Sequence, residues 1–519
     1  MADVVVVGAG PVGMTAAALL AARGVESVVL EARATTSTDP KAISLDDESL
    51  RTFADAGIVE ELLRIVSPGT GTRYYDRHGN LLLHARGPAP YRLGYPFKNP
   101  FPQPDLERAL AGALRRDPRV DLRFGTRVTA VKQDGEAARV VLADGATVEA
   151  RFVIGADGGR STVREAAGIT MTGRSYTEPW LVIDTLGDPH REMFSMHIGT
   201  PQRPTVIIPS KGGRCRYEFL LFPGEGLPGD QPPHELIARL VKPWREISPA
   251  DVERSVIYTF NGVVADTWRQ GRVFLAGDAA HMMPPFAGQG LNTGLRDVAN
   301  LTWKLAHHLA GRLSEAGLDS YEAERRPHAA ASVRLSERLG RVVHSTSHRM
   351  AASRDRQIGA AMATPEGRAF FAEMRYRPPL HFTAGLVIPG DTDGRPIPQP
   401  QGYDMTAGKV RYLDAVTGHG WALLGIGLTS GDWPAGLAVA AALPAPLAAV
   451  HVCTDDTLPD AVPAAVTVLA DVDGMINAEF GPLHGRFLLV RPDHVIAASW
   501  RPGDDTTTQT AALSAWFTP

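Results

Sequence analysis

The sequence predicts an α/β fold in which a parallel sheet with covering helices comes first and further domains follow. A run of valines at residues 4–7 leads straight into a glycine-rich turn and an apolar helix. Two later apolar segments, ending near residues 155 and 275, each lead into an aspartate that stands next to a glycine. The chain of 519 residues offers room for roughly three or four domains of ~100–200 residues each. We therefore expect distant parts of the chain to build one sheet.

The N-terminal segment is predicted to be a βαβ unit that binds a dinucleotide. Its first strand is followed by a turn that contains Gly8, Gly10, Pro11, Val12 and Gly13. Gly8 permits the tight turn, Gly10 lets the backbone approach a pyrophosphate, and Gly13 lets the helix pack closely on the strand. The second strand, at residues 27–30, leads into Glu31, whose carboxylate can accept hydrogen bonds from ribose hydroxyls. This motif does not by itself separate FAD from NAD.

The two aspartates that follow the later strands are predicted to join the same site. The first lies in the run Asp157-Gly158-Gly159-Arg160, and the second in the pair Gly277-Asp278. Open α/β sheets bind ligands outside the carboxyl ends of their strands, and both aspartates fall there. Arg160 is a candidate for the cofactor side. His281, shortly after the second motif, suits the cofactor and the start of a helix equally well.

The composition excludes several other classes of protein. The formal net charge is -4, so no basic field points to nucleic acid. No stretch approaches the ~20 apolar residues of a membrane span. The two cysteines, Cys215 and Cys453, are far apart and form no CxxC or metal-binding spacing. This pattern predicts a cytoplasmic protein with no disulfide scaffold and no metal site.

The two aspartate motifs resemble those of the flavoprotein aromatic hydroxylases, the family of p-hydroxybenzoate and phenol hydroxylases. In that family the first motif serves both FAD and NAD(P)H, and the aspartate of the second contacts the FAD ribitol. The match continues towards a long helix that starts near Thr293, through the residues Pro285, Gly288, Gln289, Gly290, Leu291 and Asn292. By resemblance the helix N-terminus faces the flavin, where it would stabilise the negative charge of the reduced ring.

The resemblance extends to other segments that line the cofactor in the family. Residues 40–48 are similar to the loop near the flavin, although Lys41 stands where the family usually has arginine and lacks its planar fork. These similarities imply FAD contacts beyond the motif residues from Ala32, Arg33, Lys41, Gln103 and Val128. Within the family, the sequence is most similar to the 3-(3-hydroxyphenyl)propionate hydroxylases and to actinobacterial polyketide or aromatic ring hydroxylases.

Four regions are expected along the chain. An FAD-binding domain of the glutathione reductase-like Rossmann type takes residues 1–75, 100–172 and 270–345. An α+β substrate domain over the flavin takes residues 76–99 and 173–269, and a helical segment with a linker takes residues 346–384. By resemblance, residues 385–519 form a thioredoxin-like domain without CxxC, with strands at 422–425, 449–452 and 487–490. We expect that domain to serve structure or subunit contact, with a homodimer as the candidate assembly.

The resemblance implies an FAD-dependent monooxygenase. NAD(P)H, bound transiently because the sequence has no second glycine-rich unit, reduces FAD. O2 is the co-substrate, and a flavin C4a-hydroperoxide transfers a hydroxyl group to a small aromatic, phenolic substrate. The alternative is a related flavin oxygenase that epoxidises a polyketide-type natural product or inserts oxygen in Baeyer-Villiger fashion. A two-domain NAD dehydrogenase is disfavoured by the aspartate motifs, and a non-catalytic flavin-fold binding protein would show no NAD(P)H oxidation stimulated by an aromatic compound.

Residues that would contact the substrate are only weakly indicated. His197, Tyr217 and Tyr258 lie on predicted strands of the substrate domain, where one of them could hydrogen-bond a phenol. For each residue alone, a place in the core or on the surface is the commoner outcome. The pair Arg325 and Arg326 is expected on the solvated face of a helix.

Overall fold

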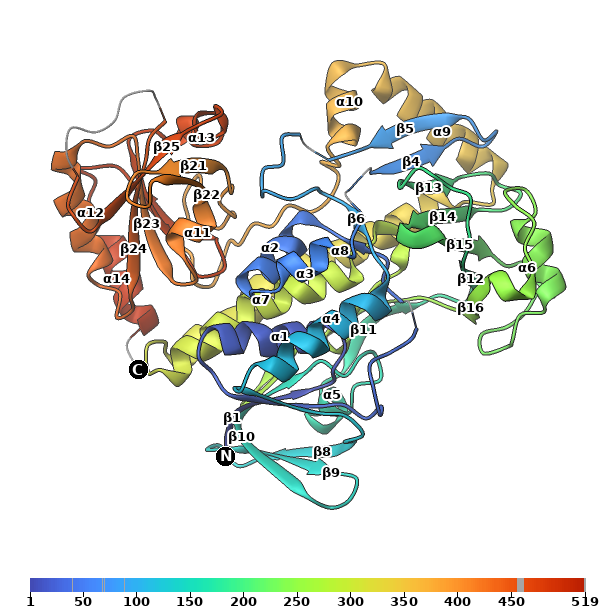
Figure 1. The fold of residues 1–519 in the computed structure, drawn as a ribbon, viewed down its shortest axis with the longest axis horizontal. Helices are drawn as coiled ribbons and strands as arrows, with labels where there is room; N and C mark the ends of the chain where they lie inside the picture. Colours follow the sequence, from blue (N-terminus) through green and yellow to red (C-terminus); the bar gives the residue numbers. More distant parts are fainter. Residues whose placement is uncertain (40, 68, 70, 88, 455–461, 518–519) are drawn as a thin grey trace.

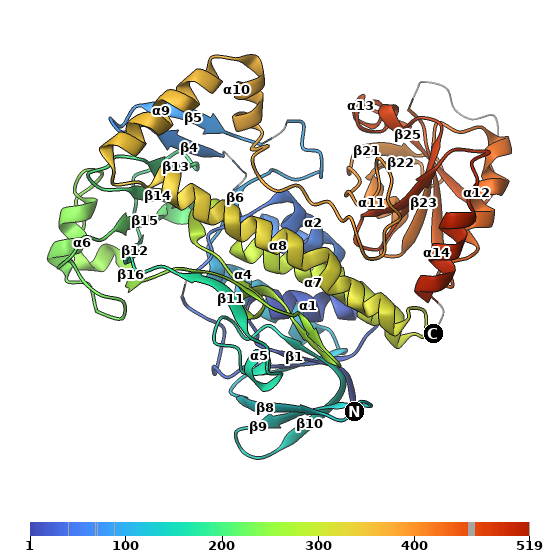
Figure 2. The same ribbon diagram turned by 180° about the vertical axis from the view of Figure 1, so that it is seen from behind.

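Two long helices cross the middle of the molecule, and the larger sheets are arranged around them. The computed structural model describes residues 1–39, 41–67, 69, 71–87, 89–454 and 462–517. Pro40, at the start of the segment expected near the flavin, lies outside these residues. Helices α7 (Gly290–Leu309) and α8 (Glu315–Val343) run side by side in both views (Figure 1 and Figure 2). Within the described part of the chain, no helix has the length and hydropathy that a membrane crossing needs.

The first sheet is the predicted parallel sheet, assembled from distant segments. Its hydrogen-bonded order is β18-β19-β10-β1-β2-β7, and the antiparallel strands β8 and β9 join it beside β10. The strands are β1 (Ala2–Val7), β2 (Ser27–Leu30), β7 (Val120–Arg123), β8 (Val128–Gln133), β9 (Ala138–Leu142), β10 (Thr147–Gly155), β18 (Arg269–Gln270) and β19 (Val273–Leu275). The strands expected before the glycine turn and before the two aspartates are β1, β10 and β19, so these predictions are confirmed.

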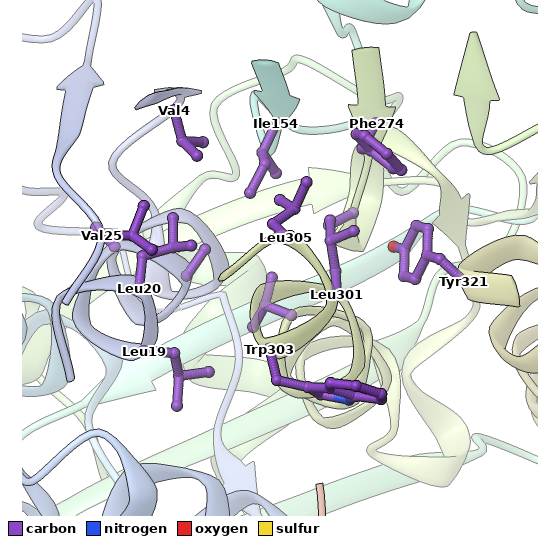
Figure 3. Packing of buried hydrophobic residues seen from close by; sticks show 14 of the residues in the cluster. Val4, Leu19, Leu20, Val25, Ile154, Phe274, Leu301, Trp303, Leu305 and Tyr321 are labelled. Carbon is purple, nitrogen blue, oxygen red and sulfur yellow. The ribbon is translucent and has the colours of Figure 1, made fainter. Parts of the chain in front are cut away.

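Apolar side chains from two helices cover this sheet. The alanine- and leucine-rich α1 (Pro11–Ala22) packs against α7 and against α4 (Gln103–Arg116). Figure 3 shows Leu20 of α1 and Leu301 and Leu305 of α7 next to Val4 and Ile154 of the strands, and all five side chains are fully buried. Burying one such leucine contributes ~1.5–3 kcal/mol to folding. The spacing of Leu301 and Leu305 thus places one face of α7 on the sheet.

A second, mostly antiparallel sheet lies near the C-terminal end of α8. Its order is β16-β12-β15-β14-β13-β4-β5, and the pair β13 and β4 is parallel. The strands are β4 (Thr72–Tyr75), β5 (Leu81–Ala85), β12 (Trp180–Thr185), β13 (Ser195–Ile198), β14 (Thr205–Ser210), β15 (Arg214–Leu220) and β16 (Val252–Tyr258). Strand β4 belongs to this sheet, although the sequence analysis placed residues up to 75 in the first domain. Helix α6 (His234–Val241) covers one face of the sheet.

Shorter elements connect these layers. Two small sheets have the orders β11-β17-β20 and β3-β6. Their strands are β3 (Ser44–Leu45), β6 (Asn99–Pro100), β11 (Met171–Ser175), β17 (Asn261–Ala265) and β20 (His281–Met282). The remaining helices before the C-terminal region are α2 (Asp47–Asp55), α3 (Val59–Leu63), α5 (Thr162–Ala166), α9 (His348–Met362) and α10 (Pro365–Ala372). Figure 1 shows α9 and α10 beside β4 and β5.

The C-terminal region forms a third sheet with helices on both sides. Its order is β22-β21-β25-β24-β23-β26-β27, and β23, β24 and β25 are parallel to one another. The strands are β21 (Gln401–Asp404), β22 (Lys409–Tyr412), β23 (Trp421–Ile426), β24 (Leu447–Val452), β25 (Val466–Asp471), β26 (Arg486–Val490) and β27 (Ile496–Trp500). The helices are α11 (Leu413–Thr417), α12 (Trp433–Ala440), α13 (Met475–Phe480) and α14 (Thr507–Phe517). The strands predicted here from the sequence are confirmed as β23, β24 and β26.

The C-terminal region shares buried contacts with the first domain. Trp303 of α7 meets Trp421 of β23 edge to face, with ring centroids 5.8 Å apart. A single apolar cluster continues from the first sheet through these rings into the third sheet. Arg51 of α2 reaches the same region and donates hydrogen bonds of 2.6 and 2.5 Å to Asp414. The third sheet is therefore packed onto the first domain as a fixed part of the fold.

A fully buried charge cluster stands at this junction. Glu324 of α8 accepts two hydrogen bonds of 2.8 Å from Arg491 and one of 2.7 Å from Lys304 of α7. Burial acts to raise the pKa of Glu324, but the two cations outweigh it and hold that pKa at about 2. Arg491 of the C-terminal region and Lys304 of α7 thus share the carboxylate of Glu324.

The prediction that Arg325 and Arg326 lie on a solvated face of α8 is wrong. Arg325 is fully buried and donates to Asp297 of α7 at 3.1 Å, and the partly buried Arg326 donates to the Ala265 carbonyl at 3.0 Å. The error arose because a pair of arginines on a helix is usually exposed, and the matching carboxylate is distant in sequence. Both arginines serve to fix α8 against its neighbours.

Substituting Glu324→Gln should destabilise the protein by roughly 3–5 kcal/mol, because two buried cations lose their shared carboxylate. Glu149→Gln is the matched control, since Glu149 forms an exposed pair with Arg139 and such pairs contribute at most ~1 kcal/mol. Urea unfolding followed by fluorescence measures both. Equal unfolding midpoints for the two variants would contradict the role assigned to the cluster.

Candidate functional site

The carboxyl ends of four parallel strands lie level at one edge of the first sheet. Val7 of β1 is in register with Leu30 of β2 and with Gly155 of β10. Gly155 is in turn in register with Leu275 of β19. The motif residues that follow these ends directly, and therefore gather at this edge, are Gly8, Glu31, Asp157 and Asp278.

The glycine-rich turn has the geometry expected from its sequence. Gly8 has a φ of +103°, and a Cβ there would lie 2.5 Å from the Ala156 carbonyl oxygen. A Cβ on Gly13 would lie 2.0 Å from the carbonyl oxygen of Gly8, so helix and turn are in direct contact. A Cβ on Gly10 would meet nothing within 4 Å. The steric roles predicted for Gly8 and Gly13 are confirmed, and Gly10 presents open backbone on which a phosphate could lie.

Glu31 is an ionised group held in place at the end of β2. Its Oε2 accepts a hydrogen bond of 2.9 Å from the Ala9 N–H, and its Oε1 accepts one of 2.9 Å from the Arg33 N–H. Burial acts to raise the pKa of Glu31, but the Arg33 hydrogen bonds outweigh it, and the pKa lies below its ordinary value. The carboxylate is thus charged and oriented beside the exposed residues Ala32 and Arg33.

Asp278 is the carboxylate at this edge that is most open to a ligand. Its side chain is exposed to solvent, yet desolvation by the surrounding protein raises its pKa. The two observations agree if the carboxylate faces an enclosed space rather than the outer surface. Lys41 and His281 act in the opposite direction on that pKa. Gly277, with a φ of +60°, turns the backbone so that Asp278 projects from the strand end.

His281 supports the Asp278 turn from inside the protein. It is fully buried, and its Nε2 lies 2.7 Å from Oδ2 of Asp297. The same oxygen accepts a hydrogen bond of 3.1 Å from the Gly277 N–H, while Arg325 binds the other oxygen. His281 therefore positions the turn through Asp297 instead of facing a ligand.

The loop after β10 is tied to the loop after β19. Asp157 supports the start of α5, whose N-cap is Ser161, by accepting hydrogen bonds from the Ser161 hydroxyl at 2.5 Å and from the Val163 N–H at 3.1 Å. Arg164 is buried and donates to the carbonyls of Ala279 and Gly159 at 3.2 and 3.0 Å. Arg160 is exposed. Of the two arginines near this motif, Arg164 holds the loops together, and Arg160 is the one open to a cofactor.

Three polar residues predicted to contact the cofactor use their side chains to hold neighbouring loops. Gln103 accepts a hydrogen bond of 2.6 Å from the Ala42 N–H. Asn292 accepts one of 3.0 Å from the Asp46 N–H and donates one of 3.1 Å to the Ser44 carbonyl. Gln289 donates to Asp46 at 3.3 Å. Any contact of these residues with a cofactor would have to share those bonds or use the backbone.

The other predicted contact residues differ in their accessibility. Val128 is buried at the start of β8, so it can offer its backbone alone. The predicted residues that are partly or fully exposed are Gly10, Pro11, Val12, Ala32, Arg33, Lys41, Asp157, Gly158, Arg160, Asp278, Pro285, Gly288, Gly290 and Leu291.

These residues fit an FAD molecule. Gly10 and Gly288 are open where a Cβ would stand, Glu31 is a charged acceptor at the second strand end, and Asp278 is a carboxylate open to a ligand. Phosphates suit a glycine turn at a helix N-terminus, and hydroxyl groups suit carboxylate acceptors. The edge therefore supplies the two kinds of group that a dinucleotide needs, open backbone for its phosphates and carboxylate acceptors for its hydroxyl groups.

A pocket opens at the start of α7. The turn that leads into α7 contributes Gly288 and Gln289 to it, and the first turn of the helix contributes Asn292. The rest of its lining comes from the loop before α2, the second sheet, the segment between β5 and β6, the turn before α7, α8, and the segment after α10. It comprises Ser44, Asp46, Thr72, Tyr74, Phe97, Lys98, His197, Phe286, Ala287, Leu335, Leu339, Met374, Tyr376 and Arg377. Residues predicted to meet the flavin and a residue predicted to meet the substrate thus share one cavity.

The three substrate-side candidates are placed differently. His197 lines the pocket, stacks on Tyr74 with centroids 5.0 Å apart, and has its Nδ1 3.3 Å from Nε2 of His344. Tyr217 lies on the opposite face of the sheet, fully buried, and donates to Asp188 at 2.8 Å. Tyr258 packs edge to face on Phe260 and is not part of the pocket lining described above.

Four residues line the pocket that the sequence did not predict: Tyr74, Lys98, Tyr376 and Arg377. The available signal was strand alternation: Arg216 and Glu218 are buried charges on one face of β15, while Tyr217 faces the other way. The strand pairing Tyr74–His197–Val206–Glu218 places Glu218 on the same row as His197. Charged residues alternating with apolar ones in a buried strand therefore mark the functional face.

One group of potential metal ligands occurs among the described residues, outside the pocket. Asp188, His190 and Cys215 offer ligand atoms within 4.8 Å of one another. Asp188 is already bound to His190 at 2.5 Å and to Tyr217. The expectation of no metal site stays a prediction.

Known proteins compare closely with this chain. Residues 1–336 match the family model of the FAD binding domain, and residues 394–515 match that of the HcaD C-terminal domain. A relative from Mycolicibacterium gilvum (strain PYR-GCK), named 3-(3-hydroxy-phenyl)propionate/3-hydroxycinnamic acid hydroxylase, is 37% identical over 512 residues, covering 96% of this chain and 89% of the relative. A relative of the same name from Burkholderia cenocepacia (strain HI2424) is 38% identical over 430 residues, covering 82% and 79%.

Solved structures share the fold along the whole chain. The flavin-dependent monooxygenase PieE in complex with FAD and substrate superposes with a TM-score of 0.81 at 22% identity, covering 99% of this chain and 98% of PieE. Aklavinone-11 hydroxylase with FAD and aklavinone gives 0.76 at 24% identity, with the same coverage.

The strand-end geometry and these matches define a flavoprotein oxidoreductase. The chain belongs to the FAD binding domain family, and its relatives there make it an FAD-dependent aromatic hydroxylase, that is, a monooxygenase. The family resemblance drawn from the two aspartate motifs is confirmed, and the dehydrogenase alternative is excluded.

Substituting Asp278→Ala should weaken FAD binding roughly 10- to 100-fold. A charge-assisted hydrogen bond to a cofactor hydroxyl contributes ~1.5–3 kcal/mol, and each ~1.4 kcal/mol is a tenfold change in affinity. Asp144→Ala, in an exposed turn of the same domain, is the matched carboxylate control.

Cys453→Ser, in the buried C-terminal core, should leave hydroxylation nearly unchanged.

Equilibrium titration of refolded apoprotein with FAD measures the affinity of each variant. Wild-type affinity in the Asp278 variant would remove Asp278 from the cofactor site. Loss of turnover in a stably folded Cys453 variant would give the C-terminal domain a redox role.

Proposed function

We propose that the pocket beside α7 holds a small phenolic ring for hydroxylation. The observation that carries this proposal is the shared lining, because the flavin-side turn at Gly288–Asn292 and the aromatic wall around His197 enclose one cavity. The curated relatives are named for single-ring compounds, and this favours a single-ring substrate for the pocket.

The residues of the chain would orient the ring and exclude water. Phe286, Leu335 and Leu339 give the pocket an apolar side, which keeps water from the reacting atoms. Burial, together with His344 and Lys98, lowers the pKa of His197 well below its ordinary value, so its imidazole is neutral at pH 7. A neutral imidazole bonded through Nδ1 to His344 can exchange a hydrogen bond with a phenol through Nε2. When bound, FAD supplies electron transfer from NAD(P)H and the activation of O2.

We extend the proposal to the domain types and residue assignments. The parallel order β19-β10-β1-β2-β7 with the β8–β9 strands supports a glutathione reductase-like Rossmann domain. The βαβ unit β23–α12–β24 followed by the antiparallel pair β26–β27 and α14 supports a thioredoxin-like domain without CxxC. The FAD contacts and the domain limits of the sequence analysis are proposed as stated there, with β4 moved to the substrate domain. The homodimer and the cytoplasmic location stay predictions.

The direct test is substrate-stimulated NAD(P)H oxidation by purified, FAD-loaded protein. A panel of single-ring phenols, including 3-(3-hydroxyphenyl)propionate, and of polyketide aromatics is screened with NADH and NADPH. We expect a single-ring phenol to stimulate oxidation and to yield a product heavier by one oxygen atom, with the new hydroxyl on the ring. A lactone or an epoxide from a polyketide would establish the alternative oxygenase chemistry.

Substitutions at His197 and Tyr217 should separate the pocket from the core. His197→Phe keeps a ring against Tyr74 but removes both nitrogens, and we expect kcat/KM to fall roughly tenfold or more, the value of one hydrogen bond of ~1.4 kcal/mol. Tyr217→Phe should leave kcat/KM within about twofold and lower the stability by ~1–3 kcal/mol, because buried Asp188 loses a donor. Steady-state kinetics and urea unfolding measure both; the reverse pattern would place the substrate on the other face.

A further inference from the structure

Lys98 brings an amine into the wall of the pocket. It comes from the segment between β5 and β6, and its Nζ donates a hydrogen bond of 2.7 Å to the hydroxyl of Thr72 at the start of β4. Two residues further along β4, Tyr74 is paired with His197 of β13, and their rings are stacked. All four residues line the pocket. The amine is therefore fixed on the wall where the proposed function places the ring hydroxyl of the substrate.

The surroundings of Lys98 disfavour its charged form. Within the described part of the chain, Lys98 forms no ion pair of 4.0 Å or less. Asp46, the carboxylate in the pocket lining, is paired instead with Arg296 at 2.5 Å and with Arg377 at 3.7 Å. An ammonium that leaves water without gaining a carboxylate is destabilised, and a nearby cation adds to this effect. Burial and Arg377 accordingly lower the pKa of Lys98 to about 7, while Glu218 acts to raise it.

The other titratable groups of the pocket are poorly suited to taking up a proton near neutral pH. Burial lowers the pKa of His197 well below its ordinary value. Burial acts to raise the pKa of Asp46, but its arginine partners outweigh it, and the pKa lies below its ordinary value. Burial raises the pKa of Tyr74 and of Tyr376, so both stay protonated, as does any arginine. Lys98 is thus the pocket group that can change its protonation state in this range.

We infer that the amine of Lys98 is the general base that removes the proton from the ring hydroxyl of the substrate, while His197 holds the same oxygen. This inference rests on the proposed function and deepens it by assigning a catalytic residue. The O–H bond breaks, its electron pair stays on the phenolic oxygen, and the proton forms a new N–H bond at Nζ. The Lys98 ammonium gives the proton up again within the turnover, because one oxygen atom of O2 leaves as water.

The transfer of this proton prepares the ring for hydroxylation. A phenolic oxygen that is losing its proton donates more electron density to the ortho and para carbons, and these carbons are the ones that an electrophilic oxygen atom attacks. A buried lysine that is held as a free amine is suited to this role. The hydrogen bond to Thr72 keeps the amine in place without supplying a charge that would favour the ammonium.

The base has a pH dependence of defined sign. A general base must be unprotonated before the transfer, so kcat/KM for hydroxylation should rise as the pH increases through about 7. The titratable and charged groups around Lys98 are Tyr74 of β4, His197 of β13, Glu218 of β15, Asp46 before α2, and Tyr376 and Arg377 after α10. Burial raises the pKa of Glu218 to about 7, and its carboxylate acts to raise the pKa of Lys98. Glu218→Gln should therefore shift the rising limb to lower pH.

The experiment measures hydroxylation of 3-(3-hydroxyphenyl)propionate and of a ring-fluorinated analogue whose hydroxyl is more acidic. The FAD-loaded wild type is compared with Lys98→Met, which removes the amine, and with Lys98→Arg, which keeps a charge but cannot act as a base. Lys211→Met, at an exposed lysine, is the matched control. Product formation gives kcat/KM across the neutral pH range, and bound flavin with urea unfolding shows that each variant is folded.

We expect both Lys98 variants to lower kcat/KM for the parent phenol roughly 100-fold or more, within the ~10²–10⁴ that general base catalysis contributes. The loss should be smaller for the fluorinated analogue, because a more acidic hydroxyl needs less help from a base. The rising limb should be absent from both variants. Their KM for NAD(P)H should be unaltered, with hydrogen peroxide formed in place of product, and Lys211→Met should match the wild type.

A Lys98→Arg variant with the rate and the pH profile of the wild type would overturn the inference, because charge alone would then suffice. A rising limb that persists in Lys98→Met would overturn it as well and would assign the titration to another group, such as Glu218. In both cases the phenol is still hydroxylated, so the proposed function stands. If the wild type hydroxylates no phenol of the panel, the proposed function fails, and the base fails with it.

Discussion

The site depends on the hydrogen bonds by which Asn292 holds residues 44–49 against the first turn of α7. This buried side chain accepts from the Asp46 N–H and the Ser49 hydroxyl, and it donates to the carbonyls of Ser44 and Gly288. Both the oxygen and the nitrogen of its amide therefore have all their hydrogen-bond partners within the protein. The position of residues 44–49 and the direction of the α7 N-terminus are fixed together. The strand-end edge and the pocket meet at this contact.

The two sheets are fastened to the same loop from opposite sides. Gln103 bonds the Ala42 N–H from the side of the first domain. Arg216 of the second sheet donates a hydrogen bond of 2.7 Å to the Lys41 carbonyl and is itself held by Asp184 at 2.8 Å. A shift of either sheet would move the loop between the cofactor edge and the pocket. This geometry explains why side chains that the family pattern associates with FAD are engaged in protein bonds: they position the backbone.

The sequence could predict the edge of the first sheet because the signals are local. Gly8 and Gly13 sit at positions where a Cβ would collide with backbone, and Asp157 and Asp278 follow apolar strands. The pocket could not be predicted in the same way. Lys98 and Arg377 stand in irregular segments far apart in the chain, and neither has a pattern that separates it from a surface residue.

The burial of the scaffold arginines could not be predicted, for the same reason. Arg325 reaches Asp297 of the preceding helix, and Arg491 reaches Glu324 from the C-terminal region. A helix-face or turn assignment considers neighbours within a few residues, whereas these partners are brought close by packing alone. Strand alternation in β15 was the one local signal of buried charge, since Arg216 and Glu218 flank Tyr217 there.

The balance of charge separates the supporting clusters from the site. At Glu324 and at Asp297, each buried carboxylate is matched by cations at hydrogen-bonding distance. Removing a charge from water is costly unless a partner offsets it, and both clusters meet that condition within the chain. Asp278 does not meet it: among the described residues it has no ion-pair partner, and desolvation raises its pKa. A fold tolerates such a cost where a ligand completes the pairing, and perturbed groups of this kind concentrate at functional sites. The unmatched anion lies at the strand-end edge, where the hydroxyl groups of a bound cofactor would complete its hydrogen bonding.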